Sequence, residues 1–165
     1  MIVRGQRFDL TNQRQIIDFE IAKPELIPEG ALQLMTIPVD AQEHAISDWS
    51  LGDKIQGVSF LKKSSSLRLV IDTASISASI AALIVVIHTD KPGMIRVKLN
   101  RAGNIFVRVN NALFDLSEYT EGRALVAFSI YRRGSIWRFR AIGESFNTGL
   151  EALYSRYIID RTDTP

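Results

Sequence analysis

Residues 124–142 read ALVAFSIYRRGSIWRFRAI, and this stretch decides the fold. Two apolar-rich runs flank the polar residues 132–135, which predicts a β-hairpin with strands over 124–131 and 136–142. Because side chains alternate across a strand, one face of the second strand carries arginines and the other carries aromatic rings. The first face holds Ile136, Arg138, Arg140 and Ile142, and the second holds Trp137, Phe139 and Ala141. The aromatic face is expected to pack into a core.

Similar short runs lie upstream of this hairpin. Residues 67–72 alternate apolar and polar side chains, which predicts a strand with one buried face. Residues 83–88 are continuously apolar and β-branched up to a final histidine, and so indicate a central strand covered on both faces. Residues 94–99 and 104–110 both alternate, and the segment 100–103 between them reads as a hairpin turn.

Residues 149–158 carry the only clear helical spacing, with Leu150, Leu153, Tyr154 and Tyr157 on one side. Together, these patterns predict a mainly β protein, a two-sheet β-sandwich with a short C-terminal helix. A length of 165 residues, with 46% hydrophobic and 23% charged residues, suits one domain over residues 1–165.

The chain contains no cysteine, which excludes disulfides, thiolate metal sites and a cysteine nucleophile. Its first residues do not resemble a secretory signal, and its longest apolar run, residues 80–87, is far shorter than the ~20 residues of a membrane helix. We therefore expect a soluble, cytoplasmic protein.

The net charge of +2 conceals a strong asymmetry. Residues 1–60 sum to −4, whereas residues 91–140 hold ten basic and three acidic side chains, a net +7. Such a split suggests a polar binding face or self-association, although a solvated sheet face is the more common origin of a charge run. The candidate contact residues in the basic segment are Arg96, Lys98, Arg108, Arg138 and Arg140.

The sequence offers little for catalysis. His44 and His88 are the only histidines, and no Gly-x-Ser-x-Gly, Walker or dinucleotide glycine motif is present. His88 closes an apolar strand, where a hydrogen-bonded structural histidine is expected, and His44 lies in a polar loop. We therefore predict that the protein is not an enzyme.

Two other kinds of binding stay open. Acidic residues gather over residues 40–53 without the spacing of an EF-hand loop, whereas Asp90 and Asn104, each just beyond a strand end, are candidate oxygen ligands that also suit turns. Arginines interleaved with aromatic residues are typical of nucleic-acid binding, although alternation sends Trp137 and Arg138 to opposite faces.

The last third of the chain resembles the tellurium-resistance stress-protein family, the TerD/TerZ/TerA group. The similarity is to the closing signature of that family. In that signature, a strand ends in Tyr-Arg and is followed by a turn, the run Trp-x-Phe-Arg-Ala, a glycine and a later Gly-Leu. The matching residues are Tyr131, Arg132, Trp137, Phe139, Arg140, Ala141, Gly143, Gly149 and Leu150. Shorter similarities at residues 4–11, 67–72, 84–88, 104–109 and 114–117 extend the resemblance, which is best over residues 67–155.

This resemblance implies a two-sheet β-sandwich and a bacterial stress-response protein of the tellurite-resistance type. It also implies calcium for several members, through a paired-aspartate Asp-Leu-Asp-x-Ser stretch that this chain lacks. We therefore expect no cofactor and a non-enzymatic binding or assembly module, whose partners are other proteins of a membrane-associated resistance complex or further copies of the chain. The alternatives are a calcium-binding domain with relocated ligands and a nucleic-acid-binding β domain.

Overall fold

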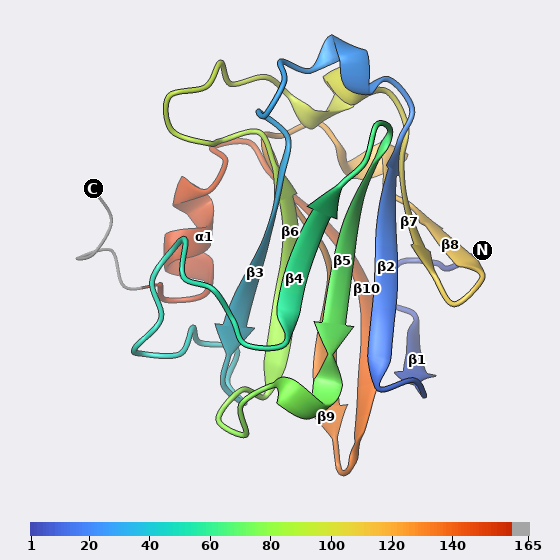
Figure 1. Ribbon diagram of the computed structural model, residues 1–165. Coiled ribbons are helices and arrows are strands. Elements are labelled where there is room, and N and C mark those ends of the chain that lie inside the picture. The colour runs from blue at the N-terminus through green and yellow to red at the C-terminus, as the bar shows by residue number, and fades with distance from the viewer. Residues whose placement is uncertain (160–165) are drawn as a thin grey trace.

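The computed structural model describes residues 1–159 as a β-sandwich with one short helix packed on its outside (Figure 1). Sheet A has the antiparallel order β4-β5-β2-β7-β8, and sheet B has the antiparallel order β1-β10-β9-β6-β3. This architecture confirms the fold that the sequence predicts.

The bounds of the elements are as follows. Sheet A contains β2 (Arg14–Ile21), β4 (Val58–Lys62), β5 (Ser66–Asp72), β7 (Ile105–Val109) and β8 (Ala112–Asp115). Sheet B contains β1 (Arg7–Leu10), β3 (Gln33–Val39), β6 (Ala82–His88), β9 (Ala124–Arg133) and β10 (Ile136–Phe146). The helical elements are η1 (Pro24–Leu26), η2 (Thr73–Ser75), η3 (Leu99–Ala102), η4 (Ser117–Tyr119) and α1 (Glu151–Arg156).

The main core lies between the two sheets. The alternation of β5 puts Leu67, Leu69 and Ile71 inside, whereas its polar residues lie on the outer face together with Val70, so the one buried face that the sequence predicts is confirmed. Aromatic rings join the layers: the ring of Phe128 in sheet B stacks on Phe139 at 4.8 Å and on Phe19 of sheet A at 5.8 Å between centroids. Trp137 is also buried here, which confirms the inward face of β10.

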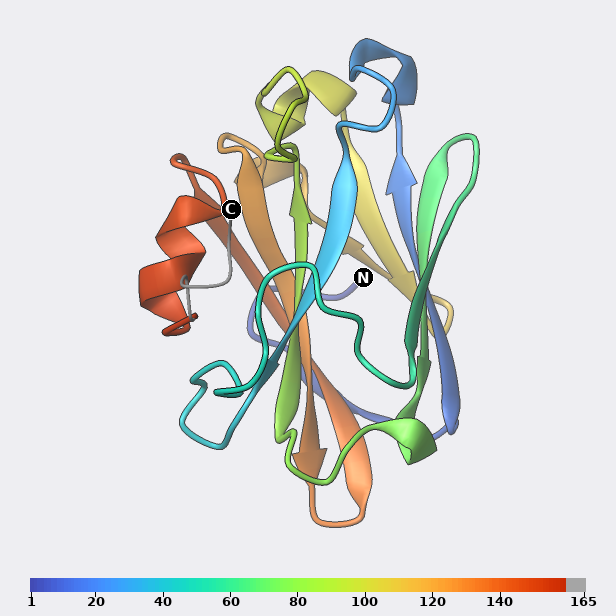
Figure 2. The same ribbon diagram turned by 60° about the vertical axis from the view of Figure 1, so that its left-hand side comes forward.

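A second apolar cluster covers part of the outer face of sheet B. There α1 and the connection 40–57 pack Trp49, Leu153 and Tyr157 against side chains of the sheet that include Ile84 and Val86. Figure 2 shows α1 against sheet B, on the side away from sheet A. Consequently every residue of β6 is buried, as its continuous apolar run predicts.

The predicted strand over residues 94–99 is wrong. Residues 94–98 lie outside any strand, and residues 99–102 form η3 instead of a hairpin turn. The reason is topological, because both edges of β7 are occupied by β2 and β8 and no edge is left for a further strand. The segment is held instead by a hydrogen bond from the Thr89 hydroxyl to the Val97 carbonyl, while Ile95 is 71% exposed.

The C-terminal helix is shorter than its sequence pattern suggests. Regular helix covers only α1, and the chain turns at residues 157–158. Within residues 1–159, no helix is long and apolar enough to cross a membrane.

Candidate binding sites

The five basic contact residues predicted from the sequence do not form one face. Arg108 points outward from sheet A, whereas Arg138 and Arg140 point outward from sheet B, on the opposite side of the sandwich. Arg96 and Lys98 lie in the exposed connection before η3. The basic segment is therefore spread around the molecule, which weakens the case for a single polyanion-binding surface.

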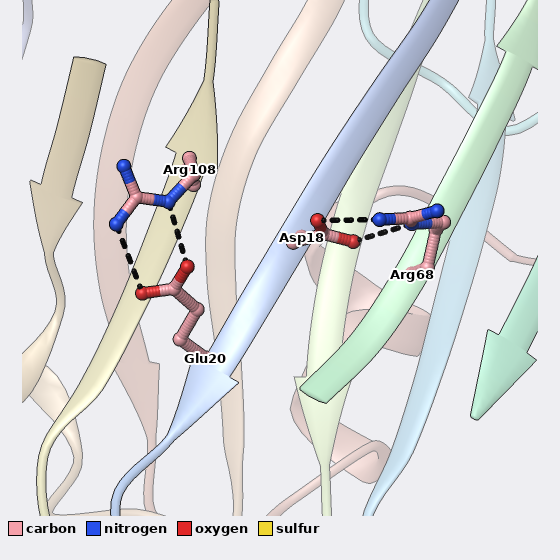
Figure 3. A network of polar contacts seen from close by, with 4 residues as sticks. All are labelled: Asp18, Glu20, Arg68 and Arg108. Carbon is pink, nitrogen blue, oxygen red and sulfur yellow. Dashed lines mark hydrogen bonds and ion pairs between the residues drawn. The ribbon is translucent and has the colours of Figure 1, made fainter. Parts of the chain in front are cut away.

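Several sheet arginines are neutralised by acids of neighbouring strands. On sheet A, Arg108 Nε donates to Glu20 Oε2 at 2.7 Å, and Arg68 Nε donates to Asp18 Oδ1 at 2.8 Å (Figure 3). Hydrogen bonding to each carboxylate raises the pKa of both guanidinium groups. Because Asp18 and Glu20 both belong to β2, this central strand supplies a partner to the strand on each side of it.

Asp90 is the centre of a buried polar cluster. Its carboxylate is 9% exposed, and Oδ1 lies 3.0 Å from Arg96 Nε and 3.7 Å from Arg123. The other oxygen, Oδ2, accepts the backbone N–H of Leu150 at 3.0 Å. The cluster lines a cavity of about 770 Å³ between the end of β6 and the start of α1. The acid thus joins two segments far apart in the sequence.

His88 is a structural residue of the same cluster. Its Nδ1 accepts the backbone N–H of Asp90 at 3.0 Å, which confirms the hydrogen-bonded histidine predicted from the sequence. Burial lowers its pKa to about 4, although the nearby Asp90 carboxylate acts in the opposite direction. His88 is therefore neutral at physiological pH.

The candidate calcium ligands Asp90 and Asn104 do not come together in residues 1–159. Asp90 already faces two arginines. Asn104 is exposed just before β7, and within residues 1–159 it neither contacts Asp90 through a hydrogen bond or ion pair nor lines the same cavity. The connection 40–57 reaches the Asp90 cavity through Leu51 and Gly52, but its acidic side chains do not, since Asp48 and Asp53 line a separate cavity beside Trp49. Across residues 1–159, no three side chains of His, Cys, Asp or Glu gather as a metal site.

An apolar groove of about 920 Å³ opens at one end of the sandwich. It lies between η1, the 63–66 turn and the 95–101 connection, and its exposed apolar residues are Leu26 at 47% and Ile95 at 71%. Its charged lining is mixed, with Lys62, Lys63 and Arg101 on one hand and Glu25 and Glu29 on the other. The groove was not predicted, because three distant segments build it and none carries a recognisable motif.

The edge of sheet A next to this groove is also open. Strand β4 pairs only with β5, and its large apolar side chains Phe60 and Leu61 are 49% and 53% exposed. A sequence signal for this strand exists, since the run VSFLK lies between Gly57 and a serine-rich turn at 64–66.

Arg140 lies on the outer face of sheet B. It lines a hollow of about 270 Å³ together with Arg7, Ser129 and Tyr131. Unlike Arg138, whose Nε donates to Asp9 at 2.9 Å, Arg140 makes no ion pair within residues 1–159. Arg140 and the exposed Lys98 are therefore the two predicted contact residues whose charges have no acidic partner in the described part of the chain.

The comparisons with known proteins agree with this architecture. The TerD domain matches residues 51–157. The uncharacterized protein YceE of Bacillus subtilis (strain 168) is 32% identical over 98 residues, which cover 54% of this chain and 51% of that protein. The chain thus spans about half the length of the curated relative it matches.

Two crystal structures show the same fold. One is a homologue of the telluride resistance protein TerD from Streptomyces coelicolor A3(2), with a TM-score of 0.62 and 17% identity over 86% of this chain and 94% of that one. The other is the protein of unknown function SAV2460, with a TM-score of 0.55 and 11% identity over 89% of this chain and 98% of that one. These structures show the fold, and the domain match over residues 51–157, well over half of the chain, shows that this chain belongs to the TerD domain family.

Proposed function

We propose that this chain is a non-enzymatic assembly module of a bacterial stress-resistance system, and that β4 is the edge through which it assembles. The single observation that carries the proposal is the exposure of Phe60 and Leu61 on an open sheet edge. Natural sheets usually protect such edges, because an unpaired strand with apolar side chains recruits a further strand. An edge left this open is suited to a partner.

The backbone of β4 is available for pairing. Along residues 59–62, the backbone N–H and C=O groups that point away from β5 have no hydrogen-bond partner within residues 1–159. A second copy of the chain offers an identical edge. If the two strands pair antiparallel about a twofold axis at Phe60, Ser59 faces Leu61 and Val58 faces Lys62. Lysines of the two copies then avoid each other, which favours homotypic pairing into one continuous sheet.

The chemistry of the other sites favours binding over catalysis. His88 is buried and bound to a backbone amide, while the Asp90 carboxylate is matched by Arg96 and Arg123. None of these groups is free to activate a nucleophile.

Sedimentation velocity from micromolar to submillimolar protein tests the assembly edge. We expect a concentration-dependent dimer that Phe60→Lys abolishes by placing like charges across the twofold axis. Ile16→Lys is the matched control, because Ile16 is 43% exposed on the same sheet but lies on the central strand β2. A wild-type monomer at every concentration, or a Phe60→Lys variant that dimerises like the wild type, would overturn the proposal.

Two alternatives from the sequence have direct tests. Saturable micromolar heat in a calcium titration would support a domain with relocated ligands, which residues 1–159 do not favour. Salt-sensitive anisotropy with labelled RNA or single-stranded DNA would support nucleic-acid binding. Membrane association of the complex, a cytoplasmic location and partner contact by the five basic residues stay predictions.

A further inference from the structure

Sheet B contains one cross-strand pair of like charge. Arg7 of β1 lies directly opposite Arg140 of β10 in the antiparallel register. Elsewhere the chain places an acid opposite an arginine, as in the pairs Asp9 with Arg138, Asp18 with Arg68 and Asp72 with Arg14. Like charges directly opposite each other destabilise a sheet. The Arg7–Arg140 pair is therefore an exception to the charge pattern of the rest of the protein.

Neither guanidinium has an acidic partner in residues 1–159. Arg7 stacks over the ring of Tyr131, with its guanidinium carbon 5.6 Å from the ring centroid. The hydroxyl of Tyr131 accepts a hydrogen bond from Arg138 at 3.3 Å, so the tyrosine is itself held in place. The side chain of Arg140 is half-buried and makes no hydrogen bond or ion pair in that part of the chain. Arg7 itself is exposed, so the desolvation falls on Arg140, and a half-buried guanidinium without a counter-charge is stabilised by a bound anion.

Next to Arg140, on the following strand, lies a serine hydroxyl. Ser129 of β9 lies opposite Arg140 in the register, on the side away from Arg7. The residue is 4% exposed and lines the hollow, and its hydroxyl has no hydrogen-bond partner among the described residues. The register thus puts Arg7, Arg140 and Ser129 side by side across three strands, and all three line the same hollow.

The other walls restrict what can enter. Arg132 is committed to its surroundings, since it donates to the carbonyls of Ile80 and Ser77 and stacks on Trp137. Asp40 and Glu43 also line the hollow, but neither makes an ion pair with Arg7 or Arg140. The lining thus carries three arginines against two carboxylates, so a small anion held by Arg7 and Arg140 is favoured, whereas a polyanion would extend further negative charges toward the carboxylates.

We infer that Arg7, Arg140 and Ser129 form a binding site for a small divalent oxyanion, namely a phosphate group, either as inorganic phosphate or as a phosphate monoester. Guanidinium groups bind phosphate through charge-assisted, often bidentate hydrogen bonds, and the serine hydroxyl adds a third donor. The site lies on sheet B, away from the assembly edge on sheet A, so it does not depend on the proposed function.

Two measurements test the site. The first is the shift in melting temperature on adding sodium phosphate, compared with sodium chloride at equal ionic strength. The second is a nuclear magnetic resonance titration that follows the Nε–H signals of Arg7 and Arg140. The variants are Arg140→Gln, Arg7→Gln and Ser129→Ala. Arg133→Gln is the matched control, because it removes the same charge from an exposed position of β9 that does not line the hollow.

We expect phosphate to stabilise the wild type and Arg133→Gln equally, and to bind Arg140→Gln and Arg7→Gln at least about tenfold more weakly. Without phosphate, removing either arginine should leave the melting temperature unchanged or raise it, because the like-charge contact disappears. A structural arginine would instead lower it. No phosphate-specific shift in the wild type, or equal weakening in Arg133→Gln, would overturn the inference.

Glycerol phosphate distinguishes the two sources. Tighter binding of the ester than of inorganic phosphate, lost on Asp40→Asn or Glu43→Gln, would assign the site to a phosphate monoester whose hydroxyls meet the acidic wall. Equal or weaker binding of the ester would assign it to inorganic phosphate.

Discussion

The carboxylate of Asp90 lies directly against Gly149. A Cβ atom at Gly149 would stand 2.3 Å from Asp90 Oδ2, and the glycine has a φ of +73°. The close approach lets Oδ2 accept the backbone N–H of Leu150. The end of β6 and the start of α1 are therefore joined through a position that only glycine fits.

Gly149→Ala should destabilise the protein by more than about 2 kcal/mol, because the new methyl group displaces the Asp90 carboxylate and adds backbone strain. Gly134→Ala is the control: its φ is +62°, but no atom lies within 4 Å of a Cβ there, so only the strain of about 1 kcal/mol remains. Urea unfolding of both variants checks the difference. Equal losses would contradict the contact.

Asp90→Asn should cost about 1–3 kcal/mol of unfolding free energy, because Arg96 and Arg123 lose their counter-charge inside a partly buried cluster. Asp48→Asn, at an exposed position of the acidic connection, should change stability by less than about 0.5 kcal/mol. Thermal unfolding of the two variants and the wild type, at low and at high salt, measures both changes in stability and how far each depends on charge. A neutral Asp90→Asn variant would show that the two ion pairs contribute nothing net.

The stability of the protein should fall as the pH is lowered from 6.5 to about 4. His88 in the folded state has a pKa of about 4, whereas the unfolded chain takes up the proton near the ordinary value of 6.5, so protons favour unfolding in this window. The total loss from His88 is about 3 kcal/mol. His88→Asn should flatten the profile in denaturant unfolding, and His44→Gln, in an exposed loop, should leave it unchanged.

The pair Arg68–Asp18 should couple more strongly than Arg108–Glu20 in double-mutant cycles. In both pairs the arginine makes two hydrogen bonds to the carboxylate (Figure 3). The side chains of Arg68 and Asp18 are 28% and 20% exposed, whereas those of Arg108 and Glu20 are 46% and 39% exposed, so water screens the second pair more strongly. Raising the salt concentration should reduce the second coupling more. The reverse order of the two coupling energies would refute this account.

The strands that could be predicted are those whose pattern is local. Alternation identified β5 and β7, and the continuous apolar run identified β6, because each pattern reports burial of that strand alone. The aromatic face of β10 was correct for the same reason. Strand β2 has an equally clear alternation in RQIIDFEI and was overlooked.

The rest depends on contacts between distant segments. Residues 94–98 alternate as a strand would, yet they have no edge to join. The cross-strand partners of Arg138 and Arg140 cannot be read from the sequence, because they lie on β1, which is more than a hundred residues away. A list of basic residues therefore could not separate the matched Arg138 from the unmatched Arg140.

The covering of β6 on both faces has a consequence for local opening. The amides of β6 lie between the main core and the cluster under α1, so they should exchange with solvent deuterium only through global unfolding. Those of β4, on the open edge of sheet A, should exchange through local fraying. The protein thus combines a slowly exchanging inner layer with an edge that opens readily, and a partner strand on β4 would be detected as new protection there.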